Sequence, residues 1–114
     1  MKATEVYKPP FRAEGAYIFS SNDVMSLMAA DCWNYPDEMM QRIVEILNDE
    51  SKPNGTPEVG RNDMEICLNG DPLLTVRGWG HLTGVGGLNL PPEEADKIQD
   101  EFAVWVVSKL RGTE

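Results

Sequence analysis

The sequence contains no long apolar run and few basic residues, cysteines or histidines. A helix that crosses a bilayer needs about 20 consecutive apolar residues, and no stretch of this chain supplies them. The first ten residues also lack the apolar centre of a secretory signal peptide. We therefore expect a cytoplasmic protein with no membrane partner.

Positive charge is scarce, because 10 Lys and Arg stand against 19 Asp and Glu, for a net charge of -9. Binding to phosphates needs clustered basic side chains, so we expect no direct nucleic-acid binding. An acidic surface favours solubility and basic partners. One alternative is an inhibitor of the phage or mobile-element type, whose acids mimic nucleic acid and block a DNA- or RNA-binding protein. Because the acids are spread along the chain, a solvated acidic surface is the simpler interpretation.

The two cysteines and the single histidine do not form a recognisable site. Cys32 and Cys67 lie in separate predicted elements, and we expect them to be reduced, buried thiols. His81 alone cannot complete a typical zinc site. Paired acids such as Glu93-Glu94 occur at predicted helix starts, where the helix dipole favours them. We therefore predict no metal, no cofactor and no catalytic residue, and we favour a binding protein over an enzyme.

Four apolar stretches are predicted to be strands, in two pairs. The first pair covers residues 16–19 and 24–29 and turns through four polar residues. The second pair covers residues 64–68 and 73–77 and turns at Asn69-Gly70, where both residues tolerate positive φ. Apolar and polar residues alternate over 64–68, which supports the assignment of a strand.

A proline-started helix is predicted after each pair of strands. Apolar residues recur at spacings of three and four over residues 36–48 and again over 91–110, which predicts two amphipathic helices. Proline in the first turn and the acids that follow it suit a helix start. The predicted fold class is therefore α+β, a ββα-ββα pseudo-repeat with an antiparallel sheet of about four strands and both helices packed on one face.

The remaining segments complete the predicted domain organisation. Pro9-Pro10 forbids a helix near the N-terminus and favours an extended backbone there. A long polar stretch in the middle has almost no aliphatic side chain to bury, so it is predicted to be a linker. The predicted boundaries are 1–15 for an extended arm, 16–114 for a single α+β domain, 16–48 for its first ββα unit, 49–63 for the polar linker and 64–114 for the second ββα unit.

An outward-facing arginine and tryptophan define a candidate binding surface. If Leu74 and Val76 point into the core, alternation places Arg77 and Trp79 on the face away from the helices. Tryptophan and arginine are enriched among the residues that dominate binding energy. The glycine-rich segment 78–90 follows directly, and it can bind a partner or wrap tightly against the fold. The predicted interaction surface consists of Arg77, Trp79, His81 and Thr83.

We expect a non-enzymatic protein-interaction or accessory domain whose partner is another protein or a second copy, with self-association into a homodimer favoured. The arm, the glycine-rich segment or a second subunit would then cover the face of the sheet away from the helices. An alternative is a small ligand-binding protein or enzyme that uses the segment around His81. That segment lacks the spacing of the usual phosphate-binding motifs, and prolines remove donors at the helix start that follows it.

Overall fold

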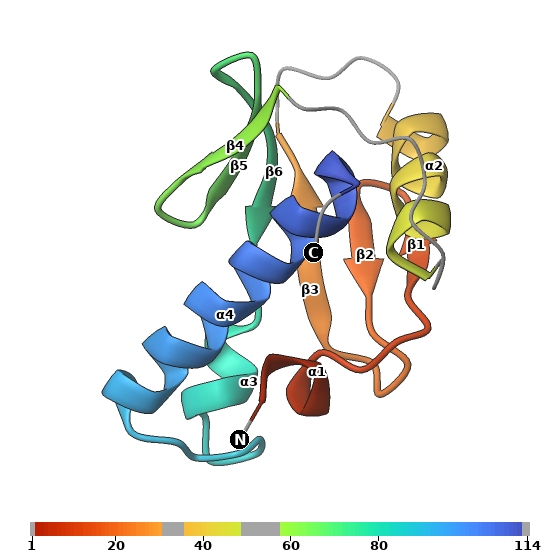
Figure 1. Cartoon of the computed structure of the whole chain (residues 1–114). Coiled ribbons are helices and arrows are strands. Elements are labelled where there is room, and N and C mark those ends of the chain that lie inside the picture. The colour runs from red at the N-terminus through yellow and green to blue at the C-terminus, as the bar shows by residue number, and fades with distance from the viewer. Residues whose placement is uncertain (1, 31–35, 49–57, 113–114) are drawn as a thin grey trace.

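The computed structural model describes residues 2–30, 36–48 and 58–112. Within these residues the chain is α+β, with six strands in one antiparallel sheet and four helices (Figure 1). The strand order in the sheet is β1-β2-β3-β6-β5-β4. In chain order the elements are α1 (Ala3–Val6), β1 (Arg12–Glu14), β2 (Tyr17–Phe19), β3 (Met25–Ala29), α2 (Pro36–Asn48), β4 (Val59–Asn62), β5 (Glu65–Leu68), β6 (Asp71–Val76), α3 (Trp79–Thr83) and α4 (Pro92–Arg111).

The sheet consists of two halves that meet at its centre. Strands β1, β2 and β3 precede α2, whereas β4, β5 and β6 precede α3 and α4. Strands β3 and β6 join the halves, with Leu27 opposite Val76 and Ala29 opposite Leu74. The predicted order of two strands and a helix therefore occurs in both halves, but each half has a third strand in addition.

Strands β1 and β4 are the two that the sequence did not reveal, so the expected number of about four strands was wrong. Both are edge strands of three or four residues with a single aliphatic side chain each. Backbone hydrogen bonds to β2 and β5 hold them, so they form without apolar alternation. Strand β4 begins at Val59, inside the predicted linker 49–63, of which residues 49–57 lie outside the described residues.

Helices α2 and α4 lie on the same face of the sheet (Figure 1). Helix α2 contacts β1 and β2, α4 contacts β4, and the two helices contact each other. The bounds predicted for the first helix are confirmed, and the second runs over 92–111 where 91–110 was predicted. Gly112 ends α4 with a φ of 76°, a conformation that glycine adopts without steric cost. None of the described helices has the length and apolar character needed to cross a bilayer.

The core lies between the sheet and these two helices. Ile18, Leu27 and Val76 stand opposite one another across β2, β3 and β6, and each is at most 4% exposed. Burial of such apolar area is the main favourable term in folding. The helices contribute Met40, Ile43, Val44, Leu47, Ala95, Ile98, Phe102, Ala103, Val106 and Leu110 to the same core.

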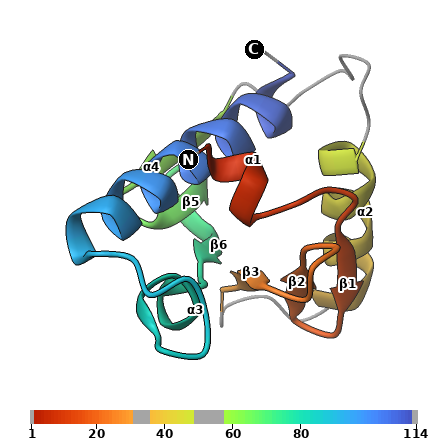
Figure 2. The same ribbon diagram turned by 90° about the horizontal axis from the view of Figure 1, so that it is seen from below.

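The N-terminal segment packs against α4 on the helix side of the sheet (Figure 2). An extended arm was predicted for residues 1–15, but this stretch contains α1 and β1. Tyr7 is fully buried, and its ring stacks on Phe102 with 4.0 Å between centroids and 9° between planes. The Asn48 side chain accepts a hydrogen bond from the Phe11 N–H at 2.6 Å and donates to the Phe11 carbonyl at 2.8 Å. Aromatic burial therefore folds the segment back, a tertiary effect that its prolines do not indicate.

Candidate interaction face

The sheet has a second face, which we call the outer face, and it carries the side chains that alternate with the core residues. Directly opposed residues in an antiparallel ladder point to the same side of the sheet. Tyr17 stands opposite Met28 and Met28 opposite Thr75, so these side chains share the outer face. They belong to a first row that crosses all the described strands and consists of Glu14, Tyr17, Met28, Thr75, Glu65 and Asn62.

A second row runs beside the first on the outer face. Arg12 stands opposite Phe19, and Phe19 stands opposite Met25. The register between β2 and β3 shifts within this stretch, so Met25 and Met28 share the face although they are three residues apart. Arg77 continues the row just past the end of β6, and its Nη2 lies 3.7 Å from the Met28 Sδ. The second row therefore consists of Arg12, Phe19, Met25 and Arg77.

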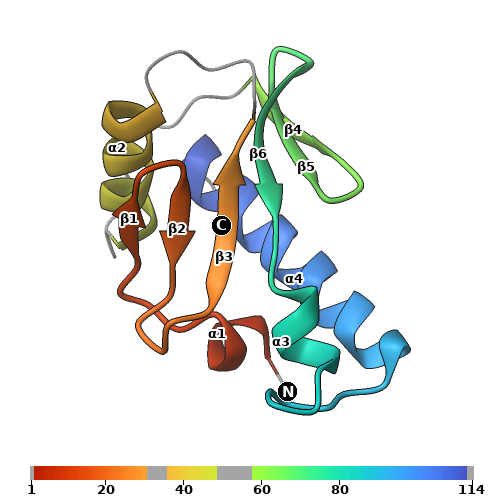
Figure 3. The same ribbon diagram turned by 180° about the vertical axis from the view of Figure 1, so that it is seen from behind.

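Four side chains of the two rows, Tyr17, Phe19, Met25 and Met28, form what we call the apolar patch. Tyr17 and Met25 are each 38% exposed, and the rings of Tyr17 and Phe19 lie 6.5 Å apart. Figure 3 shows this side of the sheet, with β1, β2, β3 and β6 in front of α4 and no described helix across them. An antiparallel sheet can leave one face to solvent, but that face is then usually polar. A contiguous apolar patch in that position is typical of an interaction site.

Charged side chains border the apolar patch on both sides. Arg12 donates to Glu14 at 2.8 Å and to Asp23 at 2.6 Å, and these hydrogen bonds raise the pKa of its guanidinium. The Arg12 Cζ also lies 5.1 Å from the centroid of the Phe19 ring, in cation–π contact. On the other border Arg77 is exposed, and within the described residues it makes no ion pair. Its guanidinium can therefore pair with a carboxylate from a partner.

The backbone that carries Arg77 is fixed from the helix side. The Tyr7 hydroxyl donates to the Arg77 carbonyl at 2.8 Å, and the Gln99 Nε2 lies 3.5 Å from the same hydroxyl. Burial raises the pKa of Tyr7 to about 12, so the phenol keeps its proton at neutral pH. Gly78 follows with a φ of 108°, and a Cβ at this position would lie 2.8 Å from the Tyr7 hydroxyl oxygen. The hydrogen bond from Tyr7 therefore fixes the backbone of Arg77 at the edge of the patch, and the space beside Tyr7 at position 78 suits only a glycine.

The four residues predicted to form the binding surface are only partly brought together. Arg77 lies on the outer face, as the alternation along β6 predicts. Trp79 does not extend that strand, because β6 ends at Val76 and Trp79 begins α3, where it is 40% exposed. His81 and Thr83 lie further along α3, and the Thr83 hydroxyl donates to the Trp79 carbonyl at 2.9 Å. For these three residues of α3, a role in binding stays a prediction.

The glycine-rich segment 78–90 wraps closely on itself and on the helix layer. The Leu88 N–H donates to the His81 carbonyl at 2.9 Å, and the Leu90 N–H donates to the Leu82 carbonyl at 2.8 Å. Helix α3 contacts α4, and it lies beyond the lower end of β6 rather than across the strands (Figures 2 and 3). The N-terminal segment packs on the helix side, so neither segment lies across β2 and β3, which carry the apolar patch.

The thiol and imidazole groups do not combine into a chemical site among the described residues. Cys67 is a buried free thiol, and burial, followed by the nearby charges of Glu65 and Asp71, raises its pKa. A raised pKa disfavours the thiolate, which is the nucleophilic form. Cys32 lies outside the described residues. No group of three metal-binding side chains occurs in the part of the chain that the structure describes.

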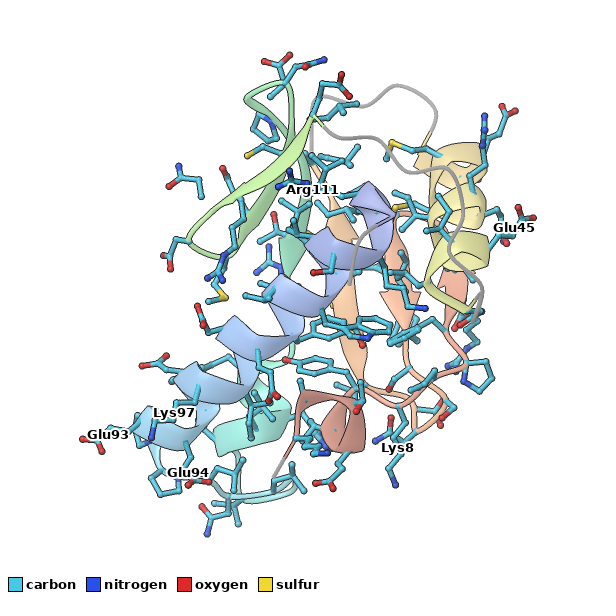
Figure 4. All side chains as sticks on the ribbon, viewed as in Figure 1. Lys8, Glu45, Glu93, Glu94, Lys97 and Arg111 are labelled. Carbon is cyan, nitrogen blue, oxygen red and sulfur yellow. The ribbon has the colours of Figure 1, made fainter. Side chains whose placement is uncertain are left out.

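Acidic side chains are distributed over separate parts of the surface (Figure 4). Glu45 lies on α2, whereas Glu93 and Glu94 lie at the far end of α4, close to Lys97. Arg111 lies at the opposite end of α4. Mimicry of nucleic acid requires carboxylates gathered on one surface, and the placement of these acids gives that alternative no support.

No protein-family model, curated protein or solved structure gives a significant match to this chain. A function must therefore be argued from its own residues. The apolar patch is not among the surfaces predicted from the sequence, although alternation around Ile18 places Tyr17 and Phe19 together on one face. Met25 and Met28 had no such signal, because only the register shift between β2 and β3 turns both outward.

Proposed function

We propose that this chain is a non-enzymatic protein-interaction domain that binds through the outer face of its sheet. The observation that supports the proposal is the apolar patch, which lies on the side of the sheet that the described helices leave uncovered. Tyrosine, phenylalanine, methionine and arginine are enriched at the centres of protein interfaces. The patch combines the first three types, with an arginine at each border.

The physical gain from binding at this face has two sources. Contact with a partner removes the exposed parts of Tyr17 and Met25 from water, which contributes about 25 cal/mol for each Å² of apolar surface. A carboxylate from the partner can also form a bidentate pair with Arg77. The strands present these side chains on a rigid support, so little conformational entropy is lost on binding. The cytoplasmic location expected from the sequence is part of this proposal.

Site-specific photo-crosslinking tests the proposal. A photoreactive phenylalanine derivative replaces Thr75, which is half-buried at the middle of the outer face. The matched control carries the same group at Val104, which is 49% exposed on α4. After irradiation of cells that express each variant, we expect a discrete protein adduct from position 75 and none from position 104.

Two results would contradict the proposal. One is no adduct at position 75 in a variant whose circular dichroism spectrum matches the unsubstituted chain. The other is the same set of adducts at both positions, because it would mean that the outer face has no preference over the helix side.

A further inference from the structure

We infer that the outer face binds a second copy of this chain. The two sheets pack face to face and are related by a two-fold axis. This axis lies perpendicular to the strands, in the plane between the two sheets, and runs between the first row and the second row. The inference rests on the proposed function, because it names the partner of the same face. The observation that supports the inference is the arrangement of positive and negative side chains in the two rows.

The register of the sheet fixes where the charges of the outer face lie. Arg12 on β1 and Arg77 at the end of β6 belong to the second row, three strand spacings or about 14 Å apart. Glu14 on β1 and Glu65 on β5 belong to the first row. The rows are about 7 Å apart, since residues i and i+2 of a strand are separated by that distance. One row therefore carries only positive charge, and the other only negative charge.

A two-fold axis across the strands places the first row of one copy on the second row of the other. Arg12 then faces Glu14 of the second copy. Arg77 faces Thr75 of the second copy and lies about one strand spacing, ~4.8 Å, from its Glu65, which a guanidinium can reach. The apolar patch faces the apolar patch, with each aromatic ring of one copy over an aromatic ring of the other. Face-to-face packing of two antiparallel sheets in this way is a common arrangement.

The other two-fold axis that would superpose the patches runs along the strands, and the charges disfavour it. It places Arg12 of one copy opposite Arg77 of the other, because these residues lie on either side of the patch in the same row. Like charges facing each other across an interface cost binding energy. The charge order therefore selects the antiparallel orientation of the two copies.

Net charge favours this face over the rest of the surface as a site of self-association. The two rows carry two arginines and two glutamates, 2 − 2 = 0, and Asp23, which pairs with Arg12 at their border, makes the sum -1, whereas the whole chain carries -9. Two acidic chains repel each other least where their facing surfaces are neutral.

The size of the face predicts a weak, reversible dimer. Six strands span about 24 Å, and strands of three to six residues span ~10–20 Å, so the projected area is roughly 400 Å² per copy. Standard interfaces bury about 800 Å² per partner. We therefore expect a dissociation constant in the micromolar range or above, measurable between about 1 µM and 1 mM chain.

Sedimentation equilibrium of Arg77→Glu and Glu65→Arg, alone and mixed, tests the inference. In a dimer of either single variant, position 77 of one copy meets a like charge at position 65 of the other. We expect each to dimerise about tenfold more weakly than the unsubstituted chain, or worse. In an equimolar mixture the heterodimer has opposite charges at both contacts, so dimerisation returns close to the unsubstituted value.

Matched variants control for net charge and for folding. Arg111→Glu and Glu45→Arg make the same charge changes at exposed positions on α4 and α2. They are expected to shift the dissociation constant much less than the outer-face variants. Urea midpoints show that each variant is folded, and both substituted positions are at least partly exposed.

Each remaining outcome overturns the inference in a distinguishable way. A dimer that responds equally to outer-face and control variants would mean that the copies associate through another surface. Two weakened variants that fail to recover on mixing would exclude the contact between positions 77 and 65. A monomer at every concentration, together with a crosslinked adduct at position 75 that does not have twice the chain mass of 12.7 kDa, would reject the second copy as partner. In that last case the proposed function would stand.

Discussion

The two faces of the sheet come from the same strands, yet they have opposite environments. Ile18 points to the helices and is fully buried, whereas its neighbour Tyr17 points outward and is 38% exposed. The helix side has two long helices and the folded-back N-terminal segment over it, and no described helix lies across β1, β2 and β3 on the outer side. Both faces nevertheless carry apolar side chains at their centres. One apolar face therefore stabilises the fold, and the other is the face for which we propose a partner.

Neighbouring substitutions on β2 give the largest expected difference between the faces. Ile18→Ala removes a fully buried side chain and should lower the free energy of unfolding by about 2–5 kcal/mol. Tyr17→Ala removes a partly exposed one and should cost about 1 kcal/mol or less in solution too dilute for the proposed dimer to form. Urea unfolding monitored by circular dichroism measures both. Equal losses from the two variants would mean that the outer face contributes to the monomer as much as the core does.

The sequence predicts an element of this fold well where several independent features of the residues agree. Helix α2 was placed to the residue, because apolar spacing, a first-turn proline and acids all agree. The turn at Asn69-Gly70 was also found, and both residues have positive φ. The sequences of β1 and β4 contain no such set of agreeing features, because these strands are defined only by their backbone hydrogen bonds to β2 and β5.

The candidate site was predictable only where alternation is regular. Arg77 follows the alternation of β6, and the sequence places it on the outer face as the structure does. Trp79 would have continued that pattern, but the left-handed Gly78 ends the strand and starts α3. The outward pair of Met25 and Met28 depends on a register shift, which is a property of strand pairing rather than of local sequence.

The hydrogen bond from Tyr7 to Arg77 links the two faces, and alkaline pH should weaken it. The pKa of Tyr7 is raised by burial to about 12 from an unfolded value of 10.0, so above pH 10 the unfolded chain loses this proton before the folded chain does. The stability from this group is complete below pH 10 and is lost as pH rises through 12, by about 2–3 kcal/mol in total. The difference in urea stability between the unsubstituted chain and Tyr7→Phe should shrink over that range.

Tyr7→Phe also has an expected effect at neutral pH. It leaves the partly buried Arg77 carbonyl without its donor, and the loss of such a hydrogen bond costs about 0.5–1.5 kcal/mol. If the difference in stability between the two proteins is the same at both pH values, the pKa of Tyr7 is the same in the folded and the unfolded chain. Thermal unfolding followed at pH 8 and at pH 11 is sufficient for the comparison.

Gly78 lies between Arg77 and α3, and its replacement should have an effect similar in size to that of Tyr7→Phe. Gly78→Ala forces an unfavourable φ of 108° on alanine and brings its Cβ within 3.3 Å of the Met25 carbonyl and closer still to Tyr7. Backbone strain of this kind costs about 1–3 kcal/mol. Gly15→Ala is the control, because φ there is also positive, at 61°, but nothing lies within 4 Å of the added Cβ. If both variants lose the same stability, the contact with Tyr7 contributes nothing beyond backbone strain.

Ion pairs should contribute least to the difference between the faces, and Arg61 provides the test. On the helix side its Nη2 lies 2.5 Å from an Asp100 carboxylate oxygen and joins edge strand β4 to α4, with side-chain exposures of 25% and 59%. Partly exposed pairs contribute about 0.2–1 kcal/mol, because solvent and salt screen the attraction. A double-mutant cycle of Arg61→Ala and Asp100→Ala should give a coupling in that range, smaller still at high salt. A coupling of several kcal/mol would mean that charge, rather than apolar burial, holds α4 on this side. The helix side would then be stabilised by ion pairs, which are the same kind of interaction that joins Arg12 to Glu14 and Asp23 on the outer face.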